Sequence, residues 1–335
     1  MAKVLSNISE LHKIADAMEP KLRQKFIEAV SRIKDNANLT KIVNEIKAGR
    51  IAGVMETLGL EAEFAAFQSD ALQAVRVLVE RGAEVAALPK GIGVSFDMTN
   101  PEVFSVIRQD VIDKVLKISV ETEAAVRAAI ERSFAEGIPT LQIAREIRDL
   151  VGLTQNQWAT VGRYDEYLRG LADRFTSVDD LSAVAEYKLR RGGMRTLLGK
   201  KRGLGILDRT GLTGDRIETL VEKYTKKLVA ERAEVISRSL TITAANEGQE
   251  RLWRQAIEED LLDPNDWDVI GIVARDDRLC EKCMSMDGKR RPMDAPFSSG
   301  AYAGTWHPAW HPACRCATGL ARKSGAGIFA RLKAA

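Results

Sequence analysis

Two stretches near the C-terminus, ARDDRLCEKCMSMDGK (274–289) and TWHPAWHPACRCATG (305–319), contain all four cysteines of the 335-residue chain and two of its three histidines. Cys280 and Cys283 form a Cys-x-x-Cys pair, which places two thiolates on one tight turn. Zinc binds four nitrogen or sulfur ligands in a tetrahedron. We therefore predict a structural zinc site in which Cys280, Cys283 and His311 are ligands.

The number of candidate donors exceeds the four positions of a zinc tetrahedron. Cys314 and Cys316 compete for the last position, and His307 lies outside the pattern. The loop between the two stretches is rich in glycine and proline and has no apolar core of its own. A metal is the natural staple for so small a module, and structural zinc supplies folding energy on the order of 10 kcal/mol.

Two other interpretations of the cysteines remain open. One is a pair of disulfides, but the opening residues MAKVLSNISE lack the apolar core of a signal sequence, so we expect a reducing cytosol, where disulfides are rare. The other is a nucleophilic cysteine with His307 or His311 as its base, which does not need three further thiols.

A zinc hydrolase is a third class of site that these residues could form. It requires an open coordination position and a general base beside the metal. The nearby acids are Asp276, Asp277 and Asp287, whereas thiols dominate the donor set. Thiolate-rich sites are mostly structural. We therefore expect no enzymatic activity.

The composition is that of a folded, helix-rich soluble protein. Hydrophobic residues make up 45% of the chain and charged residues 29%, with nine prolines and a formal net charge of +3. This charge is too small to identify a partner. No stretch approaches the roughly 20 apolar residues of a membrane helix, so we expect no membrane association.

Apolar spacing predicts helices over most of the chain and strands near the end. Residues 14–30 form an i, i+4 apolar ladder, whereas WDVIGIVA (267–274) alternates like a strand. We predict a mainly α fold, α+β overall: a multi-helix body with a small C-terminal β-containing module held by zinc. The expected regions are an N-terminal helical region at 1–90, a helical core at 91–262, the β/zinc module at 263–325 and a tail at 326–335.

The stretch ERAEVISRSLTITAANEGQERLWRQ (231–255) predicts a helix with specialised faces. Arg232, Glu234 and Arg238 indicate either buried ion pairs that fix the register of the helix or an arginine-lined site. Small residues at 244, 245 and 248 would let a neighbouring helix approach closely. Earlier, Thr154 and Gln157 have the form of a capping box.

A basic, glycine-rich segment, KLRRGGMRTLLGKKRGLGILDR (188–209), separates two helical regions. Such a segment either contacts nucleic-acid phosphates or an acidic partner, or is a solvated surface loop. The candidate nucleic-acid ligands are Arg190, Arg191, Arg195, Lys200, Lys201 and Arg202.

Several stretches together resemble the phage minor head proteins of the Mu F-like family, also called phage head morphogenesis proteins. They occur in the family's order: FDMTNPEV (96–103), EGIPTLQIAREIRDLVGLT (136–154), RAEVISRSLTITAANEGQ (232–249), ARDDRLCEKCMSMDGK (274–289) and HPACRC (311–316). The last three are the most specific. The resemblance covers roughly residues 90 to 320, and the loop before His311 is longer than is usual in the family.

The resemblance implies a structural minor capsid protein of a tailed phage. Such proteins associate with the portal during procapsid assembly and reside in the virion, after assembly in the host cytoplasm. Implied partners are the portal protein, capsid and scaffold proteins and, in some phages, packaged DNA with which the protein leaves the capsid. The alternative function, from the metal site and the basic segment, is a zinc-ribbon-like nucleic-acid-binding protein.

Overall fold

The computed structural model describes residues 4–174, 213–276 and 279–323. Within these ranges the chain is mainly helical and ends in a small antiparallel sheet, which confirms the predicted fold class. The helices are α1 (Ile8–Asn36), α2 (Leu39–Lys47), α3 (Ile51–Leu58), α4 (Leu60–Glu84), α5 (Pro101–Glu136), α6 (Thr140–Leu150), α7 (Gln155–Arg174), α9 (Gly214–Glu258) and α10 (Glu281–Met284). The strands are β1 (Val4–Leu5), β2 (Trp267–Ile272), β3 (Arg290–Arg291) and β4 (Ala317–Arg322).

The chain divides into two compact units that are not continuous in sequence. Unit 1 comprises the described residues of Met1–Asn36, Gly59–Ser119 and Ala230–Ala335, and unit 2 those of Ala37–Leu58 and Val120–Val229. The predicted region boundaries at 90, 262 and 325 stay predictions. Among the described helices, none is long and apolar enough to cross a membrane.

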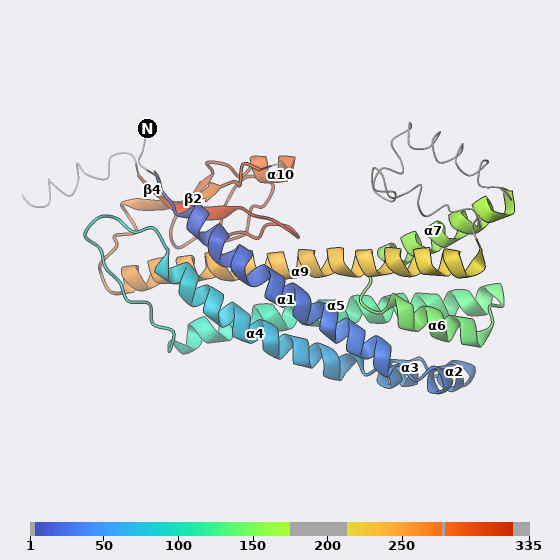
Figure 1. Ribbon diagram of the computed structural model, residues 1–335. Coiled ribbons are helices and arrows are strands. Elements are labelled where there is room, and N and C mark those ends of the chain that lie inside the picture. The colour runs from blue at the N-terminus through green and yellow to red at the C-terminus, as the bar shows by residue number, and fades with distance from the viewer. Residues whose placement is uncertain (1–3, 175–212, 277–278, 324–335) are drawn as a thin grey trace, which may run out of the picture. The chain divides into compact units, whose positions relative to one another are not determined.

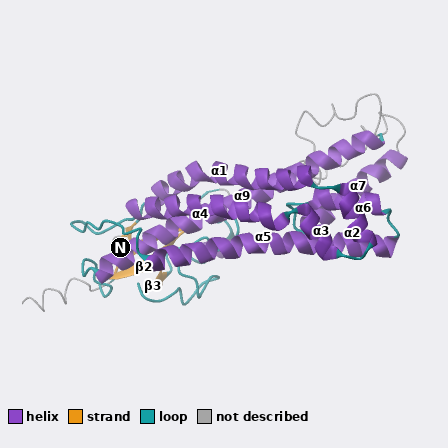
Figure 2. Ribbon diagram, turned by 90° about the horizontal axis from the view of Figure 1, so that it is seen from below, coloured by secondary structure: helices purple, strands orange, loops and turns teal. Residues whose placement is uncertain are grey.

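Unit 1 is built on helices that lie side by side. Helices α1 and α4 pack along their lengths, as Figures 1 and 2 show from two directions, and Phe26 meets Phe67 edge-on with ring centroids 5.6 Å apart. Helix α4 also approaches α9 closely: a Cβ atom on Gly248 would overlap the carbonyl of Val79. The close approach predicted from the small residues of α9 is thereby confirmed.

The sheet lies in unit 1 beside the C-terminal half of α9 (Figure 1), in the order β1-β4-β2-β3 with every neighbouring pair antiparallel. Strands β2 and β4 pair along their full length, with Val269 opposite Leu320. Both side chains are fully buried, in a cluster with Trp253 of α9. The strand predicted at 267–274 is therefore present, and this packing fixes the sheet on α9.

Unit 2 contains α2, α3, α6, α7 and parts of α5 and α9. The capping box predicted at the start of α7 is present: the Gln157 side chain accepts a hydrogen bond from the Thr154 backbone N–H (3.0 Å), and Thr154 Oγ1 accepts one from the Gln157 N–H (3.2 Å). Helix α5, whose first part belongs to unit 1, begins at Pro101, a residue whose fixed φ suits the first turn of a helix.

Candidate metal centre

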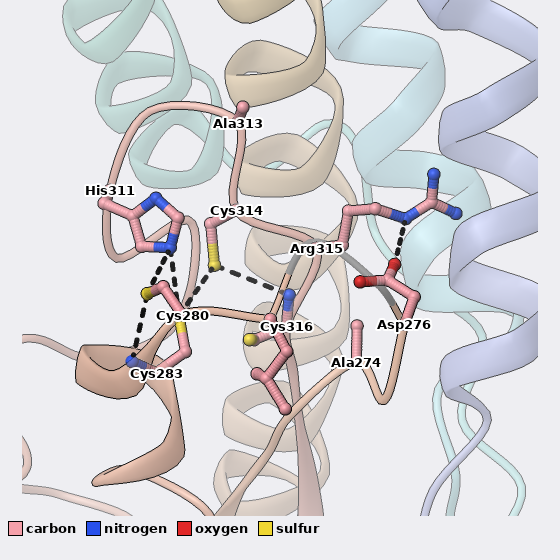
Figure 3. A pocket seen from close by; sticks show the side chains of 10 residues that line it. Ala274, Asp276, Cys280, Cys283, His311, Ala313, Cys314, Arg315 and Cys316 are labelled. Carbon is pink, nitrogen blue, oxygen red and sulfur yellow. Dashed lines mark hydrogen bonds and ion pairs between the residues drawn. The ribbon is translucent and has the colours of Figure 1, made fainter. Parts of the chain in front are cut away.

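The first pair of candidate ligands lies on the single turn of α10. Cys280 is the N-cap of this helix, and its Sγ accepts a hydrogen bond from the backbone N–H of Cys283 (3.4 Å). The cap holds the sulfur of Cys280 over the first turn, on the side from which Cys283 projects (Figure 3). The Cys-x-x-Cys spacing thus brings two thiols to one point.

The second set of ligands comes from the turn that precedes β4. The backbone N–H of Cys314 donates to the carbonyl of His311 (3.1 Å), and Ala313 between them adopts a left-handed conformation with φ of 62°. This reversal turns the imidazole of His311 and the thiol of Cys314 to the same side (Figure 3).

The two segments meet with their donor atoms in close proximity. His311 Nε2 lies 3.4 Å from Cys280 Sγ and 3.0 Å from Cys283 Sγ, and Cys283 Sγ lies 3.9 Å from Cys314 Sγ. Two groups of three donors result, each with its atoms within 4.8 Å of one another: Cys280, Cys283 and His311, and Cys283, Cys314 and Cys316. All five predicted ligands therefore belong to one cluster that can bind a metal.

Burial differs between the two sides of the cluster. Cys283, Cys314 and Cys316 are at most 2% exposed, and apolar side chains including Phe297 and Trp310 enclose them. Cys280 and His311 are half-buried, and all five donors line one small pocket. A metal would therefore reach the site from the side of Cys280 and His311.

Hydrogen bonding and burial separate the pKa values of the thiols. The side-chain hydrogen bond between Cys314 and Cys316 lowers the pKa of Cys314 and raises that of Cys316. Burial raises the pKa of Cys283, and the neighbouring charge of Cys314 raises it further. Cys314 is thus the most readily ionised of these three thiols. All four cysteines of the chain are free rather than paired in disulfides.

A row of polar side chains on α9 supports the metal-binding loop. Ser239 accepts a hydrogen bond from the backbone N–H of Ala313 (3.0 Å), and Asn246 donates to the carbonyl of Cys316 (3.3 Å). The row recurs at intervals of four, three and three residues, so its members share one helix face. The polar row consists of Ser239, Thr243, Asn246 and Gln249.

The polar row was not predicted from the sequence. Its signal is present in the chain as short polar residues at helical spacing within 232–249, but the partners are backbone groups roughly 70 residues away. Backbone groups carry no side-chain signature in a sequence. The row connects two of the three stretches that are most specific to the resemblance, 232–249 and 311–316.

His307 lies outside the cluster and takes part in a half-buried ion pair instead. Its Nε2 donates to Glu247 of α9 (2.7 Å), and its Nδ1 donates to the carbonyl of Pro308 (2.5 Å). Both ring nitrogens face acceptors, an arrangement that favours the doubly protonated imidazolium. Burial lowers the pKa of His307, but the hydrogen bond and charge of Glu247 outweigh it, and the pKa lies above its usual value.

A second ion pair, which is fully buried, lies one helical turn further along α9. Arg291 of β3 donates to Glu250 (2.5 Å), and its side chain is 0% exposed. Other guanidinium N–H groups donate to the carbonyls of Trp306 (3.0 Å) and Ala295 (3.2 Å). This arginine therefore holds both ends of the loop between the two cysteine pairs, a role that its sequence position does not reveal.

The acidic residues considered for a hydrolase are engaged in ion pairs. Asp276 lies 3.5 Å from Arg315, and Asp287 lies 3.1 Å from Arg275 and accepts from the backbone of Val273. Asp277 lies outside the described residues.

Arg238, near the middle of α9, forms the ion pairs that were predicted for this helix. Its guanidinium donates to Glu19 of α1 (2.9 Å) and to Glu234 (2.9 Å), and its side chain is 9% exposed. Arg232 is buried on the same helix. The arrangement around Arg238 is the register-fixing alternative rather than an arginine-lined site.

The six basic candidates for nucleic-acid binding, Arg190, Arg191, Arg195, Lys200, Lys201 and Arg202, lie outside the described residues.

Comparison with protein-family models, with curated proteins and with solved structures finds no match to this chain. The resemblance to the Mu F-like minor head proteins stays a prediction from the quoted stretches. What is observed at the site is a cluster of four thiols and one imidazole, supported by α9, that can bind a metal.

Proposed function

We propose that this chain is a structural minor head protein of a tailed phage, in which one zinc ion holds the C-terminal module together. The observation that carries the proposal is the series of close donor contacts between two segments, His311 with Cys280 and Cys283, and Cys283 with Cys314. The phage assignment rests on the resemblance, and the zinc assignment rests on the donor chemistry.

Two of the donor spacings match those of a single zinc ion, and the third, 3.0 Å between His311 Nε2 and Cys283 Sγ, is shorter. In a zinc tetrahedron with ordinary bond lengths, sulfurs lie about 3.8 Å apart and a sulfur lies about 3.5 Å from a nitrogen. Cys283 and Cys314 are 3.9 Å apart, and His311 lies 3.4 Å from Cys280. We assign Cys314 as the fourth ligand because its thiol is close to Cys283 and ionises most readily.

Several features favour a structural role over a catalytic one. Three thiolates and one imidazole would fill every position of the ion, and a filled tetrahedron offers no place for substrate or water. The nearby carboxylates of Asp276 and Asp287 are paired with arginines. The loop from 295 to 310 contains no helix or strand, so the metal and the contacts to α9 must hold it in place.

The way in which the module is attached supports the proposed role in the phage head. Its loop is tied to α9 by the ion pairs of Glu247 and Glu250 and by the polar row. A module fixed in this way can present a rigid surface to a portal, capsid or scaffold protein. The proposed location is the virion, with the host cytoplasm as the site of assembly.

Metal content tests the zinc part of the proposal. We expect one zinc per chain by elemental analysis, and none after Cys283→Ser. The matched control is Met284→Ala, because Met284 is the next residue and is 53% exposed. One zinc retained by Cys283→Ser, or no metal in the unaltered protein, contradicts the zinc assignment.

Co-purification tests the phage part. An epitope-tagged chain expressed with the portal, scaffold and capsid proteins of the phage that encodes it should sediment with procapsids and remain in mature particles. Recovery of the chain only as free protein, absent from particles, contradicts the minor head assignment and leaves the zinc assignment intact.

The alternative function, a zinc-ribbon-like nucleic-acid-binding protein, rests on the basic segment. If the segment binds phosphate, DNA affinity falls steeply with salt and falls again when Arg190, Arg191, Lys200 and Lys201 are replaced by glutamine. A control with four glutamines at exposed basic positions of α1 and α4, Lys13, Lys25, Arg76 and Arg81, separates this segment from general charge. Equal affinity for both variants rules out the alternative.

A further inference from the structure

The metal cluster contains one donor more than a zinc tetrahedron takes. With Cys280, Cys283, His311 and Cys314 bound to zinc, Cys316 remains beside them, 2% exposed. Its sulfur lies within 4.8 Å of both Cys283 and Cys314. The fifth donor is thus close enough to share a metal with two of the others.

The five donors divide into two groups of three that have Cys283 in common. One group consists of Cys280, Cys283 and His311, and the other of Cys283, Cys314 and Cys316. A thiolate sulfur has lone pairs to spare after it binds one metal, so a shared cysteine can bridge two ions. The arrangement therefore offers two adjacent sites of three donors that share the Cys283 thiol.

Three donors are too few for a closed zinc site, but they satisfy a soft monovalent ion. Cu(I) is a filled-shell ion for which thiolates are strongly preferred ligands. It commonly binds three ligands. Four of the five donors here are thiols and the fifth is an imidazole, which is the donor set that suits such an ion.

We propose that this cluster binds two Cu(I) ions in place of one zinc ion, one in each group of three donors, with the Cys283 thiolate as the bridge. The proposal rests on the metal-binding part of the proposed function and not on the phage assignment. Both ions stay in the +1 state, so no electron transfer is involved, and each bound thiol gives up its proton to solvent.

The surroundings of the cluster favour the binding of two Cu(I) ions. The inner group is buried beneath Phe297 and Trp310, which keep out water and oxygen that would oxidise Cu(I). The outer group (Cys280, Cys283 and His311) includes two half-buried donors, Cys280 and His311, and all five donors line the pocket that gives ions a route in. The cluster is thus shielded on one side and accessible on the other.

The test is an anaerobic titration of the metal-free full-length protein with Cu(I), buffered by a Cu(I)-specific chelator. We expect two copper ions per chain after gel filtration. We also expect the luminescence of a shielded copper–thiolate cluster, which single copper sites in water lack. Saturation at one copper per chain overturns the proposal.

Two variants locate the second ion. Cys316→Ser removes a donor from the inner group only, so it should retain one zinc but bind one copper. Zinc binding by this variant can be followed by replacing zinc with Co(II) and measuring the absorption of the bound Co(II). Retained metal binding also shows that the variant folds. Met284→Leu is the control, because Met284 carries an exposed thioether beside the cluster that could bind copper by itself. Two coppers in Cys316→Ser, or one in Met284→Leu, overturn the assignment.

Zinc is measured in parallel so that the two proposals fail separately. One zinc and one copper per chain refute the two-copper proposal and leave the zinc staple standing. Two coppers but no zinc refute the zinc staple and support the copper site.

Discussion

Glu250 of α9 and Arg291 of β3 form an ion pair whose side chains are 2% and 0% exposed. The pair joins the C-terminal module to the helical body at a point separate from the cysteines. Arg291 also lies between the rings of Phe297 and Trp306, with its guanidinium carbon 5.7 Å and 5.1 Å from their centroids. The loop is therefore held at this arginine in addition to the cysteine cluster, the His307–Glu247 pair and the polar row.

Loss of one partner of this pair should destabilise the protein strongly. Glu250→Gln leaves the buried guanidinium without its counter-charge, and breaking a buried pair in this way typically costs about 3–5 kcal/mol. Urea unfolding followed by tryptophan fluorescence measures the change. Arg275→Met is the control, since Arg275 pairs with Asp287 but is 81% exposed. Equal effects of the two variants contradict the anchoring role of Arg291.

The crossing of α4 and α9 should tolerate no side chain at Gly248. An added Cβ overlaps the carbonyl of Val79, a backbone atom that cannot move aside without shifting α4. We expect Gly248→Ala to lower the stability by roughly 1–3 kcal/mol.

Gly162 of α7 provides a control, because the same glycine-to-alanine substitution should change the stability in the opposite direction there. It lies inside a helix with no atom within 4 Å of an added Cβ. Gly162→Ala should raise the stability by roughly 0.5–1 kcal/mol, because alanine loses less backbone freedom in a helix. Thermal melts of both variants measure the two effects. A stabilised Gly248→Ala would show that the helices do not cross here.

Stability should depend on pH through the pair of His307 and Glu247. The folded pKa of His307 is raised, so its contribution is complete below the unfolded pKa of about 6.5 and is lost as pH rises through the folded pKa. Burial raises the pKa of Glu247, but His307 and Arg251 outweigh it and bring the pKa to about 2. Its contribution is therefore complete above the unfolded pKa and is lost as pH falls toward 2.

His307→Gln isolates the alkaline part of this dependence. Besides Glu247, the charges that act on His307 include that of Glu250. The variant should lose the fall in stability above pH 6.5 that the unaltered protein shows. Urea midpoints across the pH range, and the ring resonances of His307 by NMR, follow the effect. A normal histidine titration at this position contradicts the ion pair.

Removal of the metal should loosen the loop before it affects the rest of unit 1. Trp310 packs among the cysteine-bearing segments, with its ring centroid 6.2 Å from that of Phe297. A strong chelator should therefore change the tryptophan fluorescence and lower the melting temperature. Far-UV circular dichroism should stay largely helical, because the helices do not depend on the metal. Identical melting temperatures with and without chelator contradict a structural role of the metal.

Much of the site could be predicted because its signals are local. Cys280 and Cys283 are three residues apart, and His311, Cys314 and Cys316 lie within one turn, so spacing alone indicates a metal cluster. The capping box of Thr154 and Gln157 and the strand at 267–272 are local in the same way. The anchors of the loop could not be predicted, because Glu250 and Arg291 are separated by 41 residues and charged residues are common in any sequence.

The sequence by itself determined the helical body, the strand pattern and the set of five donors. These depend on the period of apolar residues and on short-range spacing, which the chain carries in order. Only the tertiary structure decided that His307 pairs with Glu247 rather than joining the donors, that Cys283 is common to both groups of three, and that α9 carries the loop. Those outcomes depend on which buried groups meet across the fold, where each desolvated charge must find a partner.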